Sequence, residues 1–525
     1  MTCIGSIEVS QDLGLQEWDM LCSQGHARKM GHIENYFALA QRQDLYSNFG
    51  LFCEMNKFFS MDQLSSALRV ICLENPLLLH TVVEQQSAGD GNFYQSDKYL
   101  SKPWPEHDYI RVLGKVHISD VLLNTESELS DVVAKILAEF SSNGGRYTSQ
   151  VFKLVNSIRI PYSHESRPNW RILCFLEGDS QCRKFLFLSN HCCSDGISAS
   201  NFVHDLQERL NDPRLTSTNS GIKLDYSQDY SILPKLPAPI ESILDYKATK
   251  IHLARMVGSQ LIRELTGYRS AGPLVKRVKE PDGNEFHSFF LNLTPQELKR
   301  VRSRIKTQVH SKCTFTPFLQ ACWFATMHKC GKVFTHSFRE RFTNIVVAMN
   351  SAKLLPSEDL KLIRDYRFGC NIGGSNYNYQ ISSFDVADDP KAFWKLVEYY
   401  NDVFGEAKRQ NHFLSSMGAL MLDSMYESKN LDLALTQAFL DKPRLGTMLS
   451  NLGYIPQNAG GGEYQIQDLI FAQATGSFRF TFDISCCATD VGGLNAVLCA
   501  AKGALKSGSD WNEVCELFRN IVLRA

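Results

Sequence analysis

Residues 186–200 read "LFLSNHCCSDGISAS", an apolar run that stops at a histidine and continues with small polar residues. His191 therefore comes at the end of a predicted buried strand, and Asp195 follows four positions later, immediately before Gly196. Ligand sites are common where a strand ends and a helix begins. The residues alone leave two interpretations open. His191 serves an active site, or it is a structural strand-end histidine followed by a helix-capping aspartate.

The segments on either side of this loop predict two strands and a helix. Residues 170–176 ("WRILCFL") and 184–190 ("KFLFLSN") are short apolar runs, which we expect to form neighbouring buried strands. After the loop, apolar residues recur at helical spacing: Phe202, Val203, Leu206 and Leu210. The local unit is therefore a strand, a short loop and a helix, and Gly196 lets the loop turn sharply.

Length and composition are typical of a globular protein with room for two or more domains. The chain has 525 residues, of which 44% are hydrophobic and 21% are charged. With 55 basic and 56 acidic residues the formal net charge is −1, so no overall field attracts a polyanion. We therefore expect no nucleic-acid partner.

The 16 cysteines are not spaced like metal ligands, because the chain contains no CxxC pair. The first residues, "MTCIGSIEVSQDLG", include polar and acidic side chains and no apolar region of a secretory signal. No stretch approaches the roughly 18 consecutive apolar residues that span a bilayer. We expect reduced, mostly buried thiols in a protein that faces the cytosol.

The chain divides into two strand-rich halves around a polar middle. We assign residues 1–214 to an N-terminal lobe that carries the histidine loop, and residues 286–525 to a C-terminal lobe. Residues 215–285 are rich in Ser, Pro, Asn and Lys and include "PKLPAP", which is typical of a crossover between lobes.

The second half repeats the mixture of strands and helices. Residues 286–293 and 344–350 are apolar runs that predict strands, and residues 316–329 suit a buried helix. Residues 478–485 alternate between apolar and polar side chains, which predicts a half-buried strand. The turn residues that follow predict a hairpin with a return strand.

Missing motifs narrow the chemistry. GxSxG, GxxxxGK[ST], GxGxxG and HExxH are all absent, which disfavours serine-hydrolase, nucleotide, nicotinamide and metalloprotease chemistry. The remaining motif is HxxxD, formed by His191 and Asp195. With 14 histidines about one match is expected by chance, so the motif alone is weak.

Several stretches resemble the fungal alcohol O-acetyltransferases, a family within the HxxxD superfamily of CoA-dependent acyltransferases. The loop resembles them in "SNHCCSDGISASNFVHDL" together with "RPNWRILC" upstream. The other similar stretches are residues 25–49, 313–324 ("CTFTPFLQACWF"), 366–377 ("YRFGCNIGGSNY") and 449–453 ("LSNLG"). The resemblance therefore covers nearly the whole chain.

This resemblance implies an α/β fold of two lobes, of the chloramphenicol acetyltransferase type, with mixed sheets and a tunnel at their interface. Acetyl-CoA and the alcohol enter from opposite sides and meet at His191, which acts as the general base. A neutral imidazole with a reference pKa near 6.5 suits this task and contributes roughly 10²–10⁴-fold. The acetyl group passes directly to the alcohol, so Cys192 and Cys193 are neighbours of the base and not nucleophiles.

The resemblance also implies supporting residues. Asp195 points away from the tunnel and pairs with an arginine to hold the loop, for which we name Arg171; the alternative is an exposed, unpaired carboxylate. Ser450 and Asn451 lie where relatives bring polar donors from the second lobe, and they are candidates for stabilising the oxyanion. The alternative is that they form a plain strand-to-turn junction.

One position departs from the family pattern. Relatives carry an arginine in the segment that here reads "MNSAKLLP", and Ala352 stands in its place with Lys353 next to it. The role of that arginine cannot be transferred, so we assign no residues to CoA binding.

The C-terminal segment from Asp510 has apolar residues at helical spacing: Trp511, Val514, Cys515, Phe518, Ile521 and Val522. Its polar face is not basic, which favours a helix docked on its own core. The resemblance instead implies peripheral contact with the endoplasmic reticulum or lipid droplets through terminal segments, including residues up to Ser23. Both interpretations stay open at this stage.

The sequence therefore predicts an alcohol O-acetyltransferase that uses acetyl-CoA as a cosubstrate, with no metal and no tightly bound cofactor. Two alternatives remain: an inactive relative that binds lipid surfaces or acts as a scaffold, and a thioesterase-like acyl-CoA hydrolase. The preferred alcohol, the acyl-chain length and the oligomeric state cannot be predicted from these residues.

Overall fold

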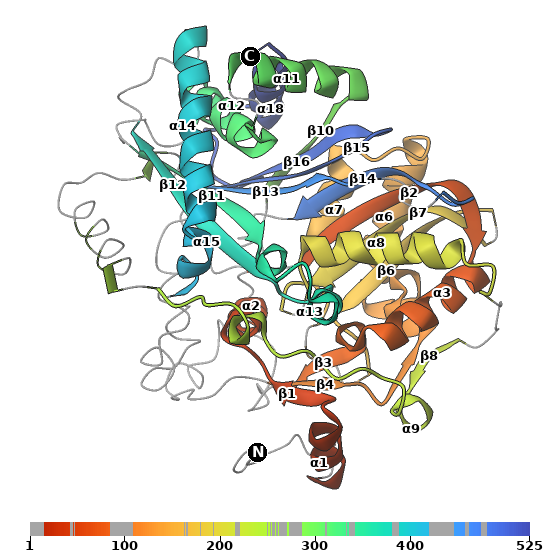
Figure 1. Cartoon of the computed structure of the whole chain (residues 1–525). Coiled ribbons are helices and arrows are strands. Elements are labelled where there is room, and N and C mark those ends of the chain that lie inside the picture. The colour runs from red at the N-terminus through yellow and green to blue at the C-terminus, as the bar shows by residue number, and fades with distance from the viewer. Residues whose placement is uncertain are drawn as a thin grey trace.

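Figure 1 presents the chain as a computed structural model. The structure describes residues 15–524, apart from positions 43–45, 47, 84–108, 162, 164–165, 179, 193, 216–220, 249, 252–253, 255–257, 259–260, 262–269, 272–285, 310–311, 332, 335–341, 381–387, 419–445, 457–460 and 474–479. Cys193 and the start of the alternating stretch 478–485 therefore lie outside the described residues.

The first lobe is built on a four-stranded antiparallel sheet in the order β14-β2-β7-β6. The two strands predicted from residues 170–176 and 184–190 are confirmed as neighbours, with Trp170 opposite Ser189. Both are buried along most of their length, because helices cover both faces of the sheet (Figure 1). The strands are β2 (Asn48–Ser60), β6 (Trp170–Glu177), β7 (Gln181–Asn190) and β14 (Ile466–Gln473).

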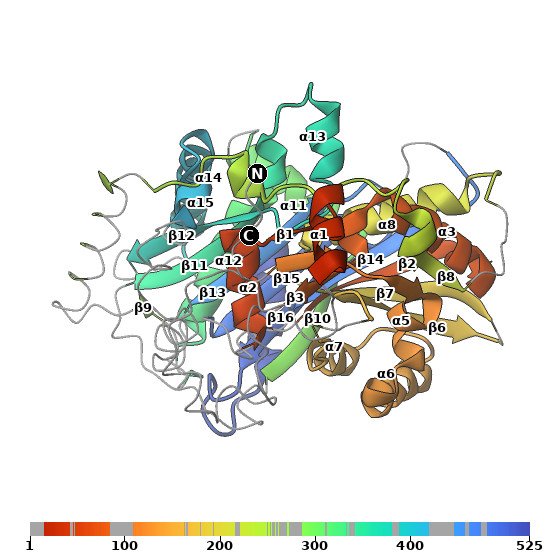
Figure 2. The same ribbon diagram turned by 90° about the horizontal axis from the view of Figure 1, so that it is seen from below.

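The covering helices lie on opposite sides of this sheet, as both ribbon views show (Figures 1 and 2). On one side are α3 (Met61–Glu74) and α8 (Gly196–Leu210), and on the other are α6 (Ser130–Ser142) and α7 (Ser149–Asn156). The predicted apolar face of the helix after the histidine loop is confirmed, since Phe202, Val203, Leu206 and Leu210 are all buried.

The second lobe is built on a mixed, seven-stranded sheet in the order β10-β16-β15-β13-β11-β12, with β9 paired to β11. β13 runs parallel to both of its neighbours, whereas β15 and β16 form the predicted antiparallel hairpin. The strands are β9 (Ser270–Ala271), β10 (Phe286–Leu293), β11 (Phe342–Asn350), β12 (Ile372–Gln380), β13 (Thr447–Tyr454), β15 (Phe482–Thr489) and β16 (Gly493–Ala501).

In Figure 1, three helices lie above this second sheet, α11 (Pro295–Gln308), α12 (Phe315–Lys329) and α18 (Trp511–Arg524), and α14 (Pro390–Arg409) runs down one side of it in contact with α12. The predicted buried helix 316–329 is α12. The apolar side of α18 lies in the core of the second lobe, with Trp511, Val514, Cys515, Phe518 and Val522 buried. The residue-based interpretation of a C-terminal helix docked on its own core is therefore confirmed.

β15 differs from the sequence prediction. The alternation in residues 478–485 predicts one solvent-facing side, but every residue of β15 is buried. The strand is central in its sheet, and its second face meets β14 of the first lobe rather than water, as the contact between Gln473 and Asp483 shows. The polar side chains of Asp483 and Ser485 therefore face the lobe interface.

β14 also crosses the division that the sequence predicts at residue 286. It follows β13 in the chain but pairs with β2, so a strand from the C-terminal range completes the first-lobe sheet. Because β14 belongs to the first-lobe sheet and its neighbours in the chain belong to the second, it links the two lobes. The cavity described below lies between the lobes, next to β2, β7, β13 and β15.

The crossover and the N-terminal segments form a smaller layer (Figure 2). β1 (Ala27–Lys29), β4 (Tyr109–Val112) and β3 (His80–Val83) make a three-stranded sheet, and β5 (Lys115–His117) pairs with β8 (Ile222–Asp225) of the crossover. The other short elements are α1 (Leu15–Gln24), α2 (His32–Arg42), α5 (Ile118–Val121), α9 (Tyr226–Asp229), α13 (Leu360–Asp365), α15 (His412–Ser415), η1 (Pro76–Leu78), η3 (Leu123–Thr125), η4 (Ser127–Leu129), η5 (Ile240–Ser242) and η7 (Ser351–Leu354).

Candidate active site

His191 is the first residue after β7, as the sequence predicts. The last residue of that strand, Asn190, accepts a hydrogen bond of 3.0 Å at its side-chain oxygen from the backbone N–H of Cys192. Such a side-chain-to-backbone bond turns the chain sharply. The turn buries Cys192 in the first-lobe core and leaves His191 half-buried on the wall of a cavity. Cys192 is thus placed away from the cavity, as a neighbour of the histidine.

Aromatic rings surround the imidazole of His191. The ring of Phe37 stacks on it, with centroids 4.3 Å apart and planes inclined by 15°. Tyr46 and Phe49 contact it at steeper angles, with centroids 5.4 and 5.1 Å away. Removal from water lowers the pKa of His191 to about 4, although hydrogen bonding to the backbone at His191 and Ser194 acts in the opposite direction. The imidazole is therefore neutral near pH 7 and able to accept a proton.

A second cysteine lies beside this ring. Cys370 Sγ is 3.8 Å from His191 Nδ1, and the thiol is almost completely buried. Cys370 is not among the described residues that line the cavity, so its thiol contacts Nδ1 from outside the cavity. This contact joins segments 179 residues apart, and no local sequence pattern predicts it.

Asp195 is the N-cap of α8 and is buried at 3% exposure. Its Oδ1 accepts from the backbone N–H of Ser198 at 2.7 Å and from the Ser198 hydroxyl at 2.9 Å. Its Oδ2 accepts from Asn350 Nδ2 at 2.9 Å and from the backbone N–H of Asn371 at 3.2 Å. Burial raises the pKa of Asp195 to about 6, while these hydrogen bonds lower it. The carboxylate is mostly ionised at pH 7 and ties the loop to the second lobe.

The prediction that Arg171 pairs with Asp195 is wrong. Arg171 is completely buried and donates to Glu126 instead, with Nε 2.6 Å from Oε2. Side chains alternate along a strand, and Arg171 shares the β6 face of Leu173, which packs beneath α6 and α7. Asp195 begins α8 on the opposite side. The alternative of an exposed, unpaired carboxylate is also wrong.

Gly196 has a different role from the one that the sequence suggests. It is the first residue of α8 and is not among the glycines with a positive φ, so no unusual turn requires it. A Cβ atom at this position would collide with the side chain of Leu452 on β13. Gly196 therefore allows the second lobe to approach the start of α8 closely.

A cavity of about 730 Å³ lies between the lobes and brings the predicted residues together. His191, Asp195 and Gly196 line it from the first lobe, and Ser450 and Asn451 line it from β13. The five sequence-predicted residues therefore share one cavity, although they come from segments about 250 positions apart.

Ser450 and Asn451 lie where β13 becomes irregular. β13 and β15 pair regularly as far as Asn451, and the register shifts before Tyr454. Asn451 Oδ1 accepts from the backbone N–H of Gly453 at 2.8 Å, and Asn451 Nδ2 donates to Thr316 Oγ1 at 3.2 Å. A side-chain amide has two N–H groups, so one donor of Asn451 is still available to a ligand. These contacts hold the side chain of Asn451 at the cavity wall, which Ser450 also lines.

One part of the cavity lining is basic: Arg302 and Lys306 on α11, Lys353 in η7 and Lys408 on α14. Lys353 is exposed, whereas its neighbour Ala352 packs partly buried against the first-lobe core. Lys408 is close enough to Lys353 for that charge to contribute, after burial, to a lowered pKa of Lys408. A positive charge is therefore present next to Ala352.

A buried polar chain on the cavity wall was missed by the sequence analysis. Tyr46 donates to Gln473 Oε1 at 3.0 Å, and Gln473 Nε2 donates to Asp483 Oδ2 at 3.1 Å. Ser485 donates to the other oxygen of Asp483 at 2.7 Å. Burial raises the pKa of Asp483 well above its ordinary value, although hydrogen bonds from Ser485 and Gln473 lower it. The alternation in residues 478–485 already placed Asp483 and Ser485 together on the polar side of the strand, and this was the only sequence pattern that could have indicated the polar chain.

Comparison with known sequences identifies the family. The alcohol acetyltransferase family profile matches residues 29–522, which is most of the chain. The chain belongs to the alcohol acetyltransferase family. Among curated members of this family, alcohol O-acetyltransferase 2 of Saccharomyces cerevisiae is 35% identical over 513 residues, covering 95% of this chain and 96% of the relative. Alcohol O-acetyltransferase 1 of the same yeast is 35% identical over 505 residues, with 96% of each chain covered.

Solved structures share the fold of this alcohol acetyltransferase family member. The trichothecene 15-O-acetyltransferase TRI3 of Fusarium sporotrichioides superposes with a TM-score of 0.58 at 11% identity, covering 95% of this chain and 94% of the other. The epimerization domain of tyrocidine synthetase TycB3 superposes with a TM-score of 0.57 at 13% identity, covering 95% of each chain. At such identities the likeness concerns the fold alone, and it confirms the predicted two-lobed α/β acyltransferase architecture.

Proposed function

We propose that this protein transfers the acetyl group of acetyl-CoA to an alcohol, giving an acetate ester and CoA, with His191 as the general base. Membership of the alcohol acetyltransferase family supports the reaction class. The observation that supports the assignment of the base is a neutral imidazole on the wall of a cavity lined by both lobes. Asp195 supports the loop that carries it.

The side chains that line the cavity favour a different part of it for each of the two substrates. The phosphates of acetyl-CoA suit the basic side chains of Arg302, Lys306, Lys353 and Lys408, because opposite charges attract a polyanionic ligand. The aromatic side chains of Phe471 and Phe480 suit the hydrocarbon part of an alcohol. The thioester and the hydroxyl would then meet near His191.

The chemical step follows from these positions. His191 takes the proton of the alcohol while the alcohol oxygen bonds to the thioester carbonyl carbon, and the carbonyl oxygen becomes an oxyanion. Ser450 and Asn451 donate hydrogen bonds to that oxygen. The intermediate collapses, the carbon–sulfur bond breaks, and the imidazolium returns its proton to the CoA sulfur. Because Cys370 Sγ lies near Nδ1, we assign the proton transfer to Nε2.

One assay separates this proposal from its alternatives. Purified protein is incubated with acetyl-CoA in the presence and absence of isoamyl alcohol, and released thiol is measured. Release that depends on the alcohol is the expected result. Release without alcohol would instead indicate a thioesterase-like hydrolase, and no release with any of a panel of alcohols would favour a binding or scaffold role.

We further propose a cytoplasmic protein that contacts the endoplasmic reticulum or lipid droplets peripherally. Within the described residues, no helix is both long and apolar enough to cross a bilayer. The apolar side of α18 is already used in the second-lobe core, so the N-terminal segment up to Ser23 is the better terminal candidate for this contact. Removing residues 1–23 should lower the membrane-bound fraction and keep activity, whereas removing residues 510–525 should give insoluble protein. A chain without residues 1–23 that stays wholly on membranes would contradict this assignment.

A further inference from the structure

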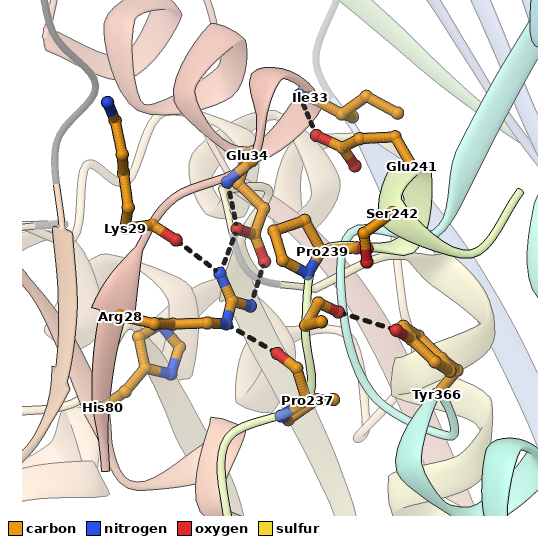
Figure 3. A network of polar contacts seen from close by, with 12 residues as sticks. Arg28, Lys29, Ile33, Glu34, His80, Pro237, Pro239, Glu241, Ser242 and Tyr366 are labelled. Carbon is orange, nitrogen blue, oxygen red and sulfur yellow. Dashed lines mark hydrogen bonds and ion pairs between the residues drawn. The ribbon is translucent and has the colours of Figure 1, made fainter. Parts of the chain in front are cut away.

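The helix that carries Phe37 is held at its start by a buried ion pair. Arg28 donates to both carboxylate oxygens of Glu34 at 2.8 Å, and Glu34 also accepts from the backbone N–H of Gly31 at 2.8 Å (Figure 3). Burial alone would raise the pKa of Glu34, but the Arg28 guanidinium holds that pKa below its ordinary value. Glu34 is therefore ionised, and the first turn of α2 is fixed against β1.

The crossover between the lobes lies directly on this helix start. Arg28 Nε donates to the backbone oxygen of Pro237 at 2.6 Å, and the backbone N–H of Ile33 donates to Glu241 at 3.4 Å (Figure 3). A carboxylate at a helix N-terminus is electrostatically favourable. A Cβ atom at Gly31 would collide with the side chain of Glu241, so this contact depends on a glycine. We call these contacts, made by Arg28, Gly31, Glu34, Pro237 and Glu241, the α2 clamp.

The same crossover segment also reaches the loop that holds Asp195. The Tyr366 hydroxyl donates to the backbone oxygen of Ala238 at 2.8 Å (Figure 3). The Asn371 side chain donates to the backbone oxygen of Tyr366 at 2.9 Å, and its backbone N–H donates to Asp195. The crossover thus connects the helix above the imidazole with the loop beside it.

We propose that Phe37 is a positioning residue for His191 and that the α2 clamp keeps its ring in place. The inference rests on the proposed function, in which His191 is the base. The Phe37 ring covers one face of the imidazole and is itself only 7% exposed, so it limits rotation of the histidine side chain. A reacting base must be held close to its best geometry, because a displacement of about 1 Å can cost about 10²-fold in rate.

Polar contacts hold the His191 ring at its nitrogen atoms, through hydrogen bonding to the backbone at His191 and Ser194 and through the contact of Cys370 with Nδ1. Of the titratable groups, Cys370 contacts Nδ1, Tyr46 contacts the ring edge, and Asp483 is connected to Tyr46 through Gln473; Asp195 follows four residues later in the same loop. Among the described contacts, no carboxylate accepts from the imidazole, in contrast to the usual aspartate that orients a catalytic histidine. Stacking against Phe37 adds a restraint of a different kind, because it covers the face of the ring rather than its nitrogen atoms.

The test compares Phe37→Leu with a matched control, Phe59→Leu. Phe59 is a completely buried phenylalanine of β2 that packs on Phe185 and lies outside the cavity. Both changes remove a buried ring, so both should lower the melting temperature by a similar amount. We expect Phe37→Leu to lower kcat about tenfold or more with KM for acetyl-CoA within about twofold, and Phe59→Leu to keep kcat. Equal kcat values for the two folded variants would overturn the inference.

A second pair of variants tests the clamp without changing the ring. Gly31→Ala inserts a methyl group between α2 and Glu241, whereas Glu241→Gln keeps an oxygen that can accept from Ile33. We expect Gly31→Ala to lower kcat severalfold at unchanged KM for acetyl-CoA, and Glu241→Gln to stay close to wild type. If Phe37→Leu fails to fold, this pair decides the matter. A Gly31→Ala protein with the wild-type kcat would overturn the inference.

Failure of this inference is distinguishable from failure of the proposed function. His191→Ala is measured in the same assay. If His191→Ala is inactive and Phe37→Leu is fully active, His191 remains the proposed base and only the positioning role of Phe37 is contradicted. An active His191→Ala would remove the proposed base itself, and with it the reason for a restraint on this ring.

Discussion

Asp195 in the first lobe accepts a hydrogen bond of 2.9 Å from the side chain of Asn350 in the second lobe. The resemblance to the family implies an arginine at this carboxylate, but neutral donors from Ser198, Asn350 and Asn371 surround it instead. The aspartate of the motif therefore joins three functions: it caps α8, it holds the histidine loop, and it connects the lobes beside the cavity.

Replacement of Asp195 should thus act on stability and activity together. Asp195→Ala removes the helix cap and the acceptor of the buried backbone N–H groups of Ser198 and Asn371 and of the partly buried Asn350 side chain, which should cost about 2 kcal/mol or more. Asp195→Asn keeps the cap oxygen and should be milder. Denaturant unfolding and acetyl transfer are measured on both variants. An Asp195→Ala protein as stable as wild type but inactive would make the aspartate a direct participant in the chemistry.

The dependence of activity on pH should reflect Asp195 before His191. On acidification, Asp195 takes up a proton near pH 6, whereas His191 stays neutral until about pH 4. A protonated Asp195 cannot accept all of its hydrogen bonds, so kcat/KM should fall with an apparent pKa near 6. In Asp195→Asn this decline should disappear, leaving a lower but flatter profile at acid pH. A decline near pH 6 that persists in Asp195→Asn would contradict the assignment.

Global unfolding should not cause that decline. The raised pKa of Asp195 favours the folded state at low pH, and this contribution is lost as the pH rises through about 6. The lowered pKa of His191 acts in the opposite sense, since stability falls as the pH drops from the reference value near 6.5 towards about 4. The two contributions oppose each other, so the melting temperature should change little between pH 7 and pH 5.5 while activity falls.

Cys370 should be dispensable for the transfer. Its thiol lies 3.8 Å from His191 Nδ1, but it is buried and does not line the cavity among the described residues. We expect Cys370→Ala to keep kcat within about threefold, since direct transfer needs no nucleophile other than the alcohol. Steady-state kinetics and intact-protein mass after mixing with acetyl-CoA are the measurements. An acetylated wild-type protein together with an inactive Cys370→Ala would indicate an acyl-cysteine intermediate.

Ser450 and Asn451 should act on the transition state. Both line the cavity, and Asn451 is held by Gly453 and Thr316 with one amide N–H left for a ligand. We expect Ser450→Ala and Asn451→Ala to lower kcat and kcat/KM together, by up to about 10²-fold, with KM nearly unchanged. A raised KM at normal kcat would instead identify them as contacts for substrate binding.

The strands and the helix that carry His191 and Asp195 could be predicted from the sequence, because their patterns depend on residues that are close in the chain. The apolar runs of β6 and β7, the spacing in α8 and the end of β7 at Asn190 all follow from neighbouring residues. The apolar stripe of α18 likewise predicts its docking on the second-lobe core. Similar stretches spread over the whole chain were enough to indicate the family and the two-lobed fold.

Long-range contacts were the part that the sequence could not supply. Arg171 pairs with Glu126 because its side chain points to the face of β6 that is opposite to α8. No local sequence pattern predicts which side chain becomes its partner. Asp483 looked solvent-facing because the alternation along β15 does not reveal that β14 covers the polar side. The stacking of Phe37 on His191 joins residues 154 positions apart through a helix outside both main sheets. Each of these depends on tertiary packing.

The most direct test of the account is the rate of alcohol-dependent CoA release by His191→Ala beside the wild-type protein. If His191 is the general base, removing its imidazole leaves the cavity and the basic side chains for CoA in place. We therefore predict a loss of two or more orders of magnitude in kcat, the range that a general base supplies, with unchanged melting temperature and CoA affinity. A His191→Ala protein that keeps more than about a tenth of the wild-type kcat would contradict the central claim.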